Sequence, residues 1–130
     1  MFHLGDFYDD FVDYAYALKD KAFQVYGNCD YISGEAGAEK IVEIEGVKIL
    51  ATHGHLYGVK QSREKLIGRA EEVGATLVFY GHTHVAEIYE KNGITLVNPG
   101  CLYEYSPQKS FAYVVINNGK ITAVINDKIV

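Results

Sequence analysis

Apolar and polar residues recur along the chain with two different periods, and these periods separate predicted helices from predicted strands. Between residues 9 and 21, apolar side chains return every three or four positions, which predicts a helix. The same spacing over residues 61–73 predicts a second helix, which ends at Gly74. Elsewhere the apolar residues form short runs or alternate with polar residues, as is typical of strands.

The predicted strands include three single strands and three hairpins. Short apolar runs predict single strands at residues 2–4, 22–28 and 75–82, and a loop follows the second of them at residues 29–38. Each hairpin is marked by a turn dipeptide between alternating segments; the turns are Glu45-Gly46 within residues 40–54, Asn92-Gly93 and Asn118-Gly119. This order of elements predicts an α/β fold, a two-layer β-sandwich flanked by helices.

Length and composition predict one domain over residues 1–130 and narrow the classes of function. The net charge is −5 and no basic stripe is present, which argues against a general nucleic-acid binder. No apolar run reaches membrane-spanning length, and the first residues do not resemble a signal peptide. We therefore expect a cytoplasmic location, with Cys29 and Cys101 as thiols in a reducing compartment.

Four of the apolar runs end in a turn that carries a side chain able to bind a metal. The turns are Gly5-Asp6, Gly27-Asn28, His53-Gly54-His55 and Gly81-His82-Thr83-His84. If the strands share one sheet, their ends meet in the crevice where such sheets bind ligands. Imidazole, carboxylate and amide donors suit manganese, iron(II) or zinc, and a pair of such ions can clamp a phosphoryl group. The pattern therefore predicts a hydrolytic metal site.

Each of these turns also has a simpler interpretation. Asp6 and Asn28, taken singly, are ordinary turn residues, and the turn with His53 and His55 could be a solvated loop. His82 and His84 are harder to explain as ordinary turn residues, because alternate residues of an extended strand point to the same side. His3 precedes the first turn, and we expect it in the core or behind the ligands rather than in contact with a metal.

Taken in order, the motifs Gly-Asp (5–6), Gly-Asn-Cys-Asp (27–30), Thr-His-Gly-His (52–55), Gly-His-Thr-His (81–84) and Asn-Pro-Gly (98–100) resemble the calcineurin-like metallophosphoesterase superfamily. The resemblance is to its small bacterial and archaeal phosphodiesterase branch, which shares its fold with the retromer subunit Vps29. It implies a phosphodiesterase or phosphatase that attacks a small-molecule phosphate ester with a metal-bound hydroxide. Manganese is the first choice of metal, with nickel, iron(II) and zinc as alternatives.

The resemblance also implies roles for individual residues. The ligands of the second metal would be Asp6, Asn28, His53 and His82. Asp6 would bridge to a first metal, which His84 would also bind. Cys29 stands where many relatives carry a histidine that contacts substrate and leaving group. His55 is therefore our candidate for protonating the leaving group.

The chain departs from the family at its start. The family begins with an Asp-x-His strand and a helix, and this sequence contains no Asp-x-His. We expect an N-terminally truncated domain, read from a start codon downstream of the true one, with the second metal site complete and the first incomplete. Such a chain is expected to be weakly active or inactive, and to form a homodimer through an exposed strand edge.

Two other functions are compatible with the same residues. One is a non-enzymatic, Vps29-like scaffold that binds proteins, and the other is a hydrolase with a single metal. Substrate specificity would come from residues 29–38, 55–60 and 102–109, which carry no readable code. The tyrosines of these regions are expected to pack at loop ends rather than to stack on a ligand; they are Tyr57, Tyr103 and Tyr105.

Overall fold

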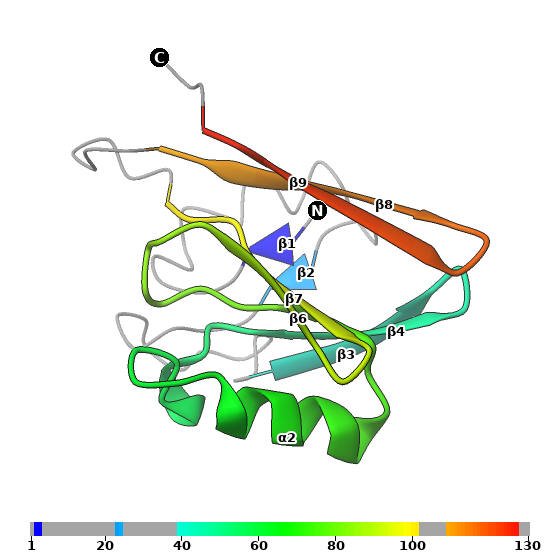
Figure 1. The fold of residues 1–130 in the computed structure, drawn as a ribbon, viewed down its shortest axis with the longest axis horizontal. Coiled ribbons are helices and arrows are strands. Elements are labelled where there is room, and N and C mark those ends of the chain that lie inside the picture. Colours follow the sequence, from blue (N-terminus) through cyan, green and yellow to red (C-terminus); the bar gives the residue numbers. More distant parts are fainter. Residues whose placement is uncertain (1, 4–22, 25–38, 102–108, 128–130) are drawn as a thin grey trace.

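The fold is described from a computed structural model, which defines residues 2–3, 23–24, 39–101 and 109–127 (Figure 1). Its main helix is α2 (Glu64–Val73), and a short 3-10 helix, η2 (His55–Tyr57), precedes it. The strands are β1 (Phe2–His3), β2 (Phe23–Gln24), β3 (Glu39–Ile44), β4 (Val47–Thr52), β5 (Leu77–Phe79), β6 (Glu87–Lys91), β7 (Ile94–Asn98), β8 (Phe111–Asn117) and β9 (Lys120–Asn126).

A five-stranded mixed sheet organises the described part of the chain. Its strand order is β3-β4-β5-β7-β6. The three central strands β4, β5 and β7 run parallel, with Leu50 opposite Val78 and Val78 opposite Leu96. The outer strands β3 and β6 run antiparallel to their neighbours. The carboxyl ends of the three central strands therefore lie at one edge of the sheet.

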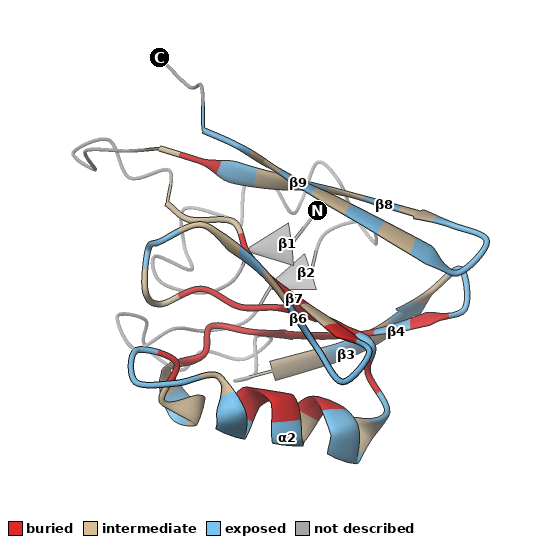
Figure 2. Cartoon of the chain, in the orientation of Figure 1, coloured by how far each residue is buried: buried red, intermediate tan, exposed pale blue. Residues whose placement is uncertain are grey.

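Both faces of this sheet are covered, which explains why its central strands are apolar without alternation. One face packs against α2 through Leu50, Val78 and Leu96. The other face packs against the β8–β9 hairpin, with Ile49 and Phe79 among the buried residues. Figure 1 shows α2 and the hairpin on opposite sides of the sheet, and Figure 2 shows the buried residues between them. The predicted sandwich with a flanking helix is confirmed.

Helix α2 forms where apolar residues recur every three or four positions, as predicted, but it starts later than predicted. Its apolar stripe of Leu66, Ile67 and Ala70 is buried against the sheet. The prediction began at residue 61, whereas the helix begins at Glu64 because the preceding residues form a turn. It ends at Gly74, as predicted, where the Gly74 and Ala75 amides donate to the last free carbonyls.

The three predicted hairpins are all present. Asn92 and Asn118 each adopt a positive φ, of 56° and 51°, before a glycine that does the same. This is the geometry of a two-residue turn whose twist matches the strands that it joins. The third hairpin, β3–β4, turns at Glu45-Gly46 with the same signs of φ.

The N-terminal predictions are tested only in part. Strands β1 and β2 fall within the predicted runs and pair in parallel, with Phe2 opposite Phe23. Among the described residues this pair forms a separate two-stranded sheet, so a shared sheet is shown only for the strands that precede His53 and His82. The predicted helix at 9–21 and the loop at 29–38 lie outside the described residues.

Two further predictions were incomplete. Strand β5 covers only Leu77–Phe79 of the predicted 75–82, because the chain turns away after Tyr80. The sequence predicted hairpins in the C-terminal half, but β7 also pairs in parallel with β5, which those hairpins do not indicate. Within the described ranges, no helix combines the length and the apolar character needed to cross a membrane.

Candidate metal centre

The candidate site lies where β4 and β5 end side by side. His53 follows β4 directly, and His82 follows the end of β5 after two residues. The Gly81 amide donates a 2.9 Å hydrogen bond to the His53 carbonyl oxygen, so the two turns are joined through their backbones. Neighbouring parallel strands thus deliver histidines from two motifs to one place, as the position of the motifs predicted.

Three histidine rings gather at this edge. The centroid of the His53 ring lies 4.9 Å from that of His82 and 5.3 Å from that of His55. The centroids of the His55 and His82 rings are 6.2 Å apart. His53 is only 2% exposed, while His55 and His82 are half-buried. The alternative of a solvated loop is therefore wrong for His53.

The spacing of two ring nitrogens fits one divalent ion. His53 Nε2 and His82 Nδ1 are 3.1 Å apart. Two imidazole nitrogens at about 2.1 Å from a common ion are separated by about 3.0 Å at a right angle and about 3.4 Å at the tetrahedral angle. The two nitrogens are hydrogen-bonded to each other, with the donor set by the tautomers, and both must be unprotonated to bind an ion.

Gly54 allows His53 and His55 to approach each other closely. Its φ is 103°, and a Cβ at this position would lie 2.9 Å from a methyl group of Val59. The chain can therefore turn sharply after His53 and enter η2, which carries His55 back toward the same edge. Any larger residue at position 54 would be strained in its backbone and would clash with Val59.

His82 and His84 differ from the sequence-based picture in their backbone. The prediction assumed an extended strand, which would aim both side chains to one side. Instead their φ angles are 68° and 60°, both left-handed, so the alternation argument was wrong. His82 turns toward His53, whereas His84 is exposed. Each left-handed non-glycine residue costs about 1–2 kcal/mol, and such strain persists only where surrounding contacts impose it.

The other predicted ligands fall outside the described residues. They are Asp6 and Asn28, and the same applies to Cys29, Tyr103 and Tyr105. Within the described part, no group of three or more His, Cys, Asp or Glu side chains has the arrangement to hold a metal alone. A complete site would therefore need donors beyond those that the structure defines. Of the two cysteines predicted to be thiols, Cys101 is described, and its side chain is half-buried.

Asn98 is a residue that the sequence analysis quoted in a motif without giving it a role. It ends β7, which lies beside β5, and its side chain is completely buried next to the turn with His82. The sequence signal that could have pointed to Asn98 was an Asn-Pro-Gly turn directly after an apolar run. Its position depends on the parallel pairing of β5 with β7, which was not predicted.

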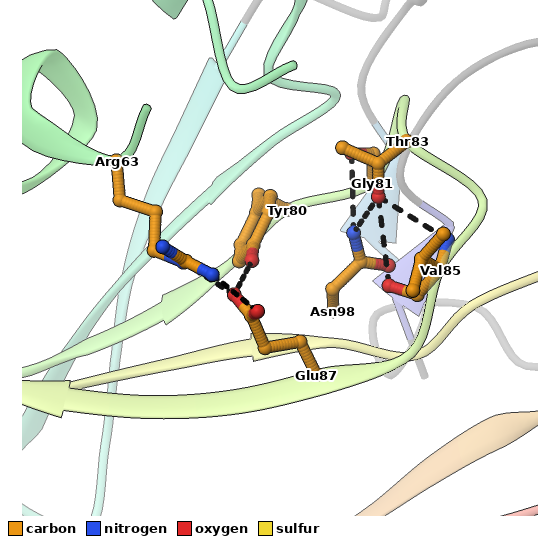
Figure 3. Close-up of polar contacts among 7 residues, drawn as sticks. All are labelled: Arg63, Tyr80, Gly81, Thr83, Val85, Glu87 and Asn98. Atoms are coloured by element: carbon orange, nitrogen blue, oxygen red, sulfur yellow. Dashed lines mark hydrogen bonds and ion pairs between the residues drawn. The ribbon is translucent and has the colours of Figure 1, made fainter. Parts of the chain in front are cut away.

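A polar network lies beside the site, on the side of α2 (Figure 3). Arg63 donates two hydrogen bonds to the Glu87 carboxylate and stacks 4.4 Å above the Tyr89 ring. The buried Tyr80 hydroxyl donates to the same carboxylate at 2.7 Å. The Arg63 hydrogen bond, opposed in part by burial, holds the pKa of Glu87 below its ordinary value.

Replacing Glu87 with glutamine is expected to lower the free energy of unfolding by about 1 kcal/mol at pH 7. The pKa of Glu87 is lower in the folded state, so its contribution is complete above the ordinary value of 4.5 and is lost as the pH falls through the lowered value. Urea unfolding between pH 7 and 3 should show the E87Q and wild-type stabilities converging on acidification. The matched control is E90Q, on the same strand; an equal effect of E90Q would contradict the prediction.

A polar pocket of about 200 Å³ adjoins this network. It is lined by Val59, residues 60–63, Tyr80, Thr83, Val85 and Glu87. Thr83 stands between His82 and His84, so the pocket reaches the loop that carries them.

Tyr57 packs against the hydrophobic core, and its hydroxyl donates to Glu39. Burial and Glu39 raise the pKa of Tyr57 to about 12, which agrees with the packing role expected for it.

Comparison with known proteins reveals relatives over nearly the whole chain. Residues 1–120 match the family model of the calcineurin-like phosphoesterase superfamily domain. The probable metallophosphoesterase YsnB of Bacillus subtilis is 36% identical over 106 residues, which cover 80% of this chain and 62% of that protein. The chain thus spans less than two thirds of the length of this relative.

Two solved structures show the same architecture. A predicted phosphoesterase from Streptococcus pneumoniae superimposes with a TM-score of 0.79 at 27% identity, covering 97% of this chain and 72% of that one. Vps29 of Entamoeba histolytica in complex with Zn²⁺ superimposes with a TM-score of 0.70 at 25% identity, covering 88% and 73% of the two chains. The predicted relation to the Vps29-like branch is therefore confirmed.

Proposed function

The chain belongs to the calcineurin-like phosphoesterase superfamily, and we propose that it hydrolyses small-molecule phosphate esters with the help of a divalent metal. The observation that carries the proposal is the 3.1 Å approach of His53 Nε2 and His82 Nδ1 at the ends of two neighbouring parallel strands. Their separation fits two ligands of one ion, and their residue types suit a borderline metal.

His53 and His82 would hold the metal together with Asp6 and Asn28, the donors that the family motifs assign to it. A divalent ion in such a site polarises a phosphoryl oxygen and activates water for attack on phosphorus. The burial of His53 keeps one ligand away from bulk water and fixes its ring against His82. His84 would serve a first metal, which Asp6 would bridge.

His55 would act on the leaving group. Its ring lies 5.3 Å from that of His53 and 6.2 Å from that of His82, so it borders the proposed metal site. An imidazole can hold a proton on a ring nitrogen and release it, which suits transfer of that proton to a departing alkoxide. We assign it the role of general acid.

The metal and the substrate are proposed at the level of chemical class. Imidazole with carboxylate and amide oxygen suits Mn²⁺, our first choice, and Ni²⁺, Fe²⁺ or Zn²⁺ as alternatives. The Zn²⁺ complex of the related Vps29 supports a divalent ion in general. The organic part of the ester would extend toward the pocket beside Thr83, whose polar lining favours a hydrophilic group. A phosphodiester is the first choice of substrate.

The proposal is tested by hydrolysis of bis-p-nitrophenyl phosphate with this chain. Weak turnover should appear on addition of Mn²⁺ and fall to the uncatalysed rate when EDTA removes the metal. A metal-independent rate, or no turnover although Mn²⁺ is bound, would contradict the proposed activity.

One observation favours a second function, that of a protein-binding scaffold. The outer face of the β8–β9 hairpin exposes four apolar side chains: Phe111, Tyr113, Val115 and Val124, which are 37% to 66% exposed. Clusters of this kind are common at protein interfaces.

A homodimer that forms through an exposed strand edge also remains a proposal. The described edges of the large sheet, β3 and β6, carry several charged residues, which disfavours pairing there.

A further inference from the structure

Asn98 connects two turns of the candidate site through its side chain, and Figure 3 shows its contacts with Gly81 and Thr83. It is completely buried, with an exposed fraction of 0%. Its Nδ2 donates to the Gly81 carbonyl oxygen at 3.3 Å and to Thr83 Oγ1 at 2.8 Å. Its Oδ1 accepts a hydrogen bond from the Gly100 amide at 3.0 Å. The amide therefore joins the end of β7 to the loop that carries His82.

Gly100 fixes the other side of this connection. Its φ is 84°, and a Cβ at this position would lie 1.9 Å from Ser110 Oγ, so only glycine fits. Ser110 is itself buried and donates to the Pro99 carbonyl oxygen at 2.7 Å. The turn after β7 is thus held on both sides, and Asn98 projects from a rigid base.

Thr83 is the partner of Asn98 within the histidine loop. Its Oγ1 accepts from Asn98 and from the Val85 amide, the latter at 3.2 Å. The Thr83 amide donates to the Gly81 carbonyl oxygen at 2.8 Å. The residue is fixed in this way between His82 and His84, the two left-handed residues whose conformation local preference does not favour.

We propose that Asn98 and Thr83 form a latch that holds the His82–His84 loop in its left-handed conformation and thereby sets the metal affinity of the site. The inference rests on the proposed function, since it assumes that His82 is a ligand. Neither latch residue touches the metal in this scheme. Both are positioning residues, which act through the place and orientation of the His82 ring opposite His53.

The test compares T83V with T83S and wild type. Valine keeps the shape of threonine and removes the hydroxyl, whereas serine keeps the hydroxyl. Titration with Co²⁺ alone, followed by its visible absorption, should show binding weakened about tenfold in T83V with a changed spectrum, and T83S should restore both. The matched control is T122V on the exposed face of β9, which should bind Co²⁺ as wild type does. Equal Co²⁺ binding by T83V and T122V would overturn the latch.

A second readout does not depend on metal. In the metal-free protein, the nuclear Overhauser contacts between the His53 and His82 rings should be present in wild type and T83S and lost in T83V. If wild type binds no Co²⁺, the proposed function fails, and the latch is then judged on these contacts alone. Their persistence in T83V would overturn it. N98D, which keeps the acceptor for Gly100 and removes both donors, should lose the contacts as T83V does.

Discussion

Replacing His82 with alanine is expected to weaken Mn²⁺ binding by more than about 100-fold and to reduce metal-dependent phosphate-ester hydrolysis to background. Loss of a group that merely supports a metal ligand costs 10–100-fold in affinity, so loss of a ligand should cost more. The structure favours His82 because its Nδ1 lies 3.1 Å from Nε2 of the buried His53, at the ends of adjacent strands. Calorimetric titration with Mn²⁺ measures the affinity, and the bis-p-nitrophenyl phosphate assay measures the rate.

Two variants make this experiment specific. K120A changes an exposed residue in the β8–β9 hairpin and should leave both quantities unchanged. H84A removes the exposed histidine of the same loop and should affect only a first metal, so its effect on the tighter Mn²⁺ equivalent should be small. Mn²⁺ binding by H82A with wild-type affinity would show that His82 is not a ligand, provided that its thermal unfolding confirms a folded protein.

Replacing Leu96 with alanine is expected to destabilise the protein by about 2–5 kcal/mol. Leu96 is completely buried at the centre of β7, opposite Val78 and facing α2. The substitution removes three buried carbon atoms and leaves a cavity that an inner strand of a covered sheet cannot close by local movement. Urea denaturation at pH 7 measures the change in the free energy of unfolding.

The same substitution at Leu56 is the control. Leu56 lies in η2 and is 59% exposed, so L56A should change the free energy of unfolding by less than about 0.5 kcal/mol. A loss below about 1 kcal/mol in L96A would contradict the described packing of the sheet against α2.

The elements fixed by local chemistry were predictable from the sequence. The Asn-Gly dipeptides at 92–93 and 118–119 require positive φ angles that few other pairs adopt, and both mark hairpins in the structure. The apolar stripe of α2 and its stop at Gly74 are local in the same sense. The start of α2 was misplaced because Gln61 and Ser62 donate backbone hydrogen bonds to Gly58 in a turn, which the apolar period does not reveal.

The geometry of the site was less predictable, because it depends on contacts between distant segments. Grouping His53 with His82 followed from the idea that parallel strands end at one edge, and the structure agrees. The left-handed backbone of His82 could not be read from the sequence, since the residue itself does not favour it and Asn98, which forms the proposed latch with Thr83, comes from a strand distant in the sequence. The predicted roles of Asp6 and Asn28 stay predictions, because both lie outside the described residues.

The arrangement of turns and crossovers also bears on the order in which the protein folds. Each of the three hairpins closes across two residues, and such hairpins form within about 1–10 μs. The parallel pairing of β4 with β5 has to wait for the much longer segment that contains α2, so loop closure makes it slower. His53 and His82 meet only through that pairing. We expect a chain with all three hairpins formed to lack the histidine cluster still, so metal capture would report a step that follows hairpin formation.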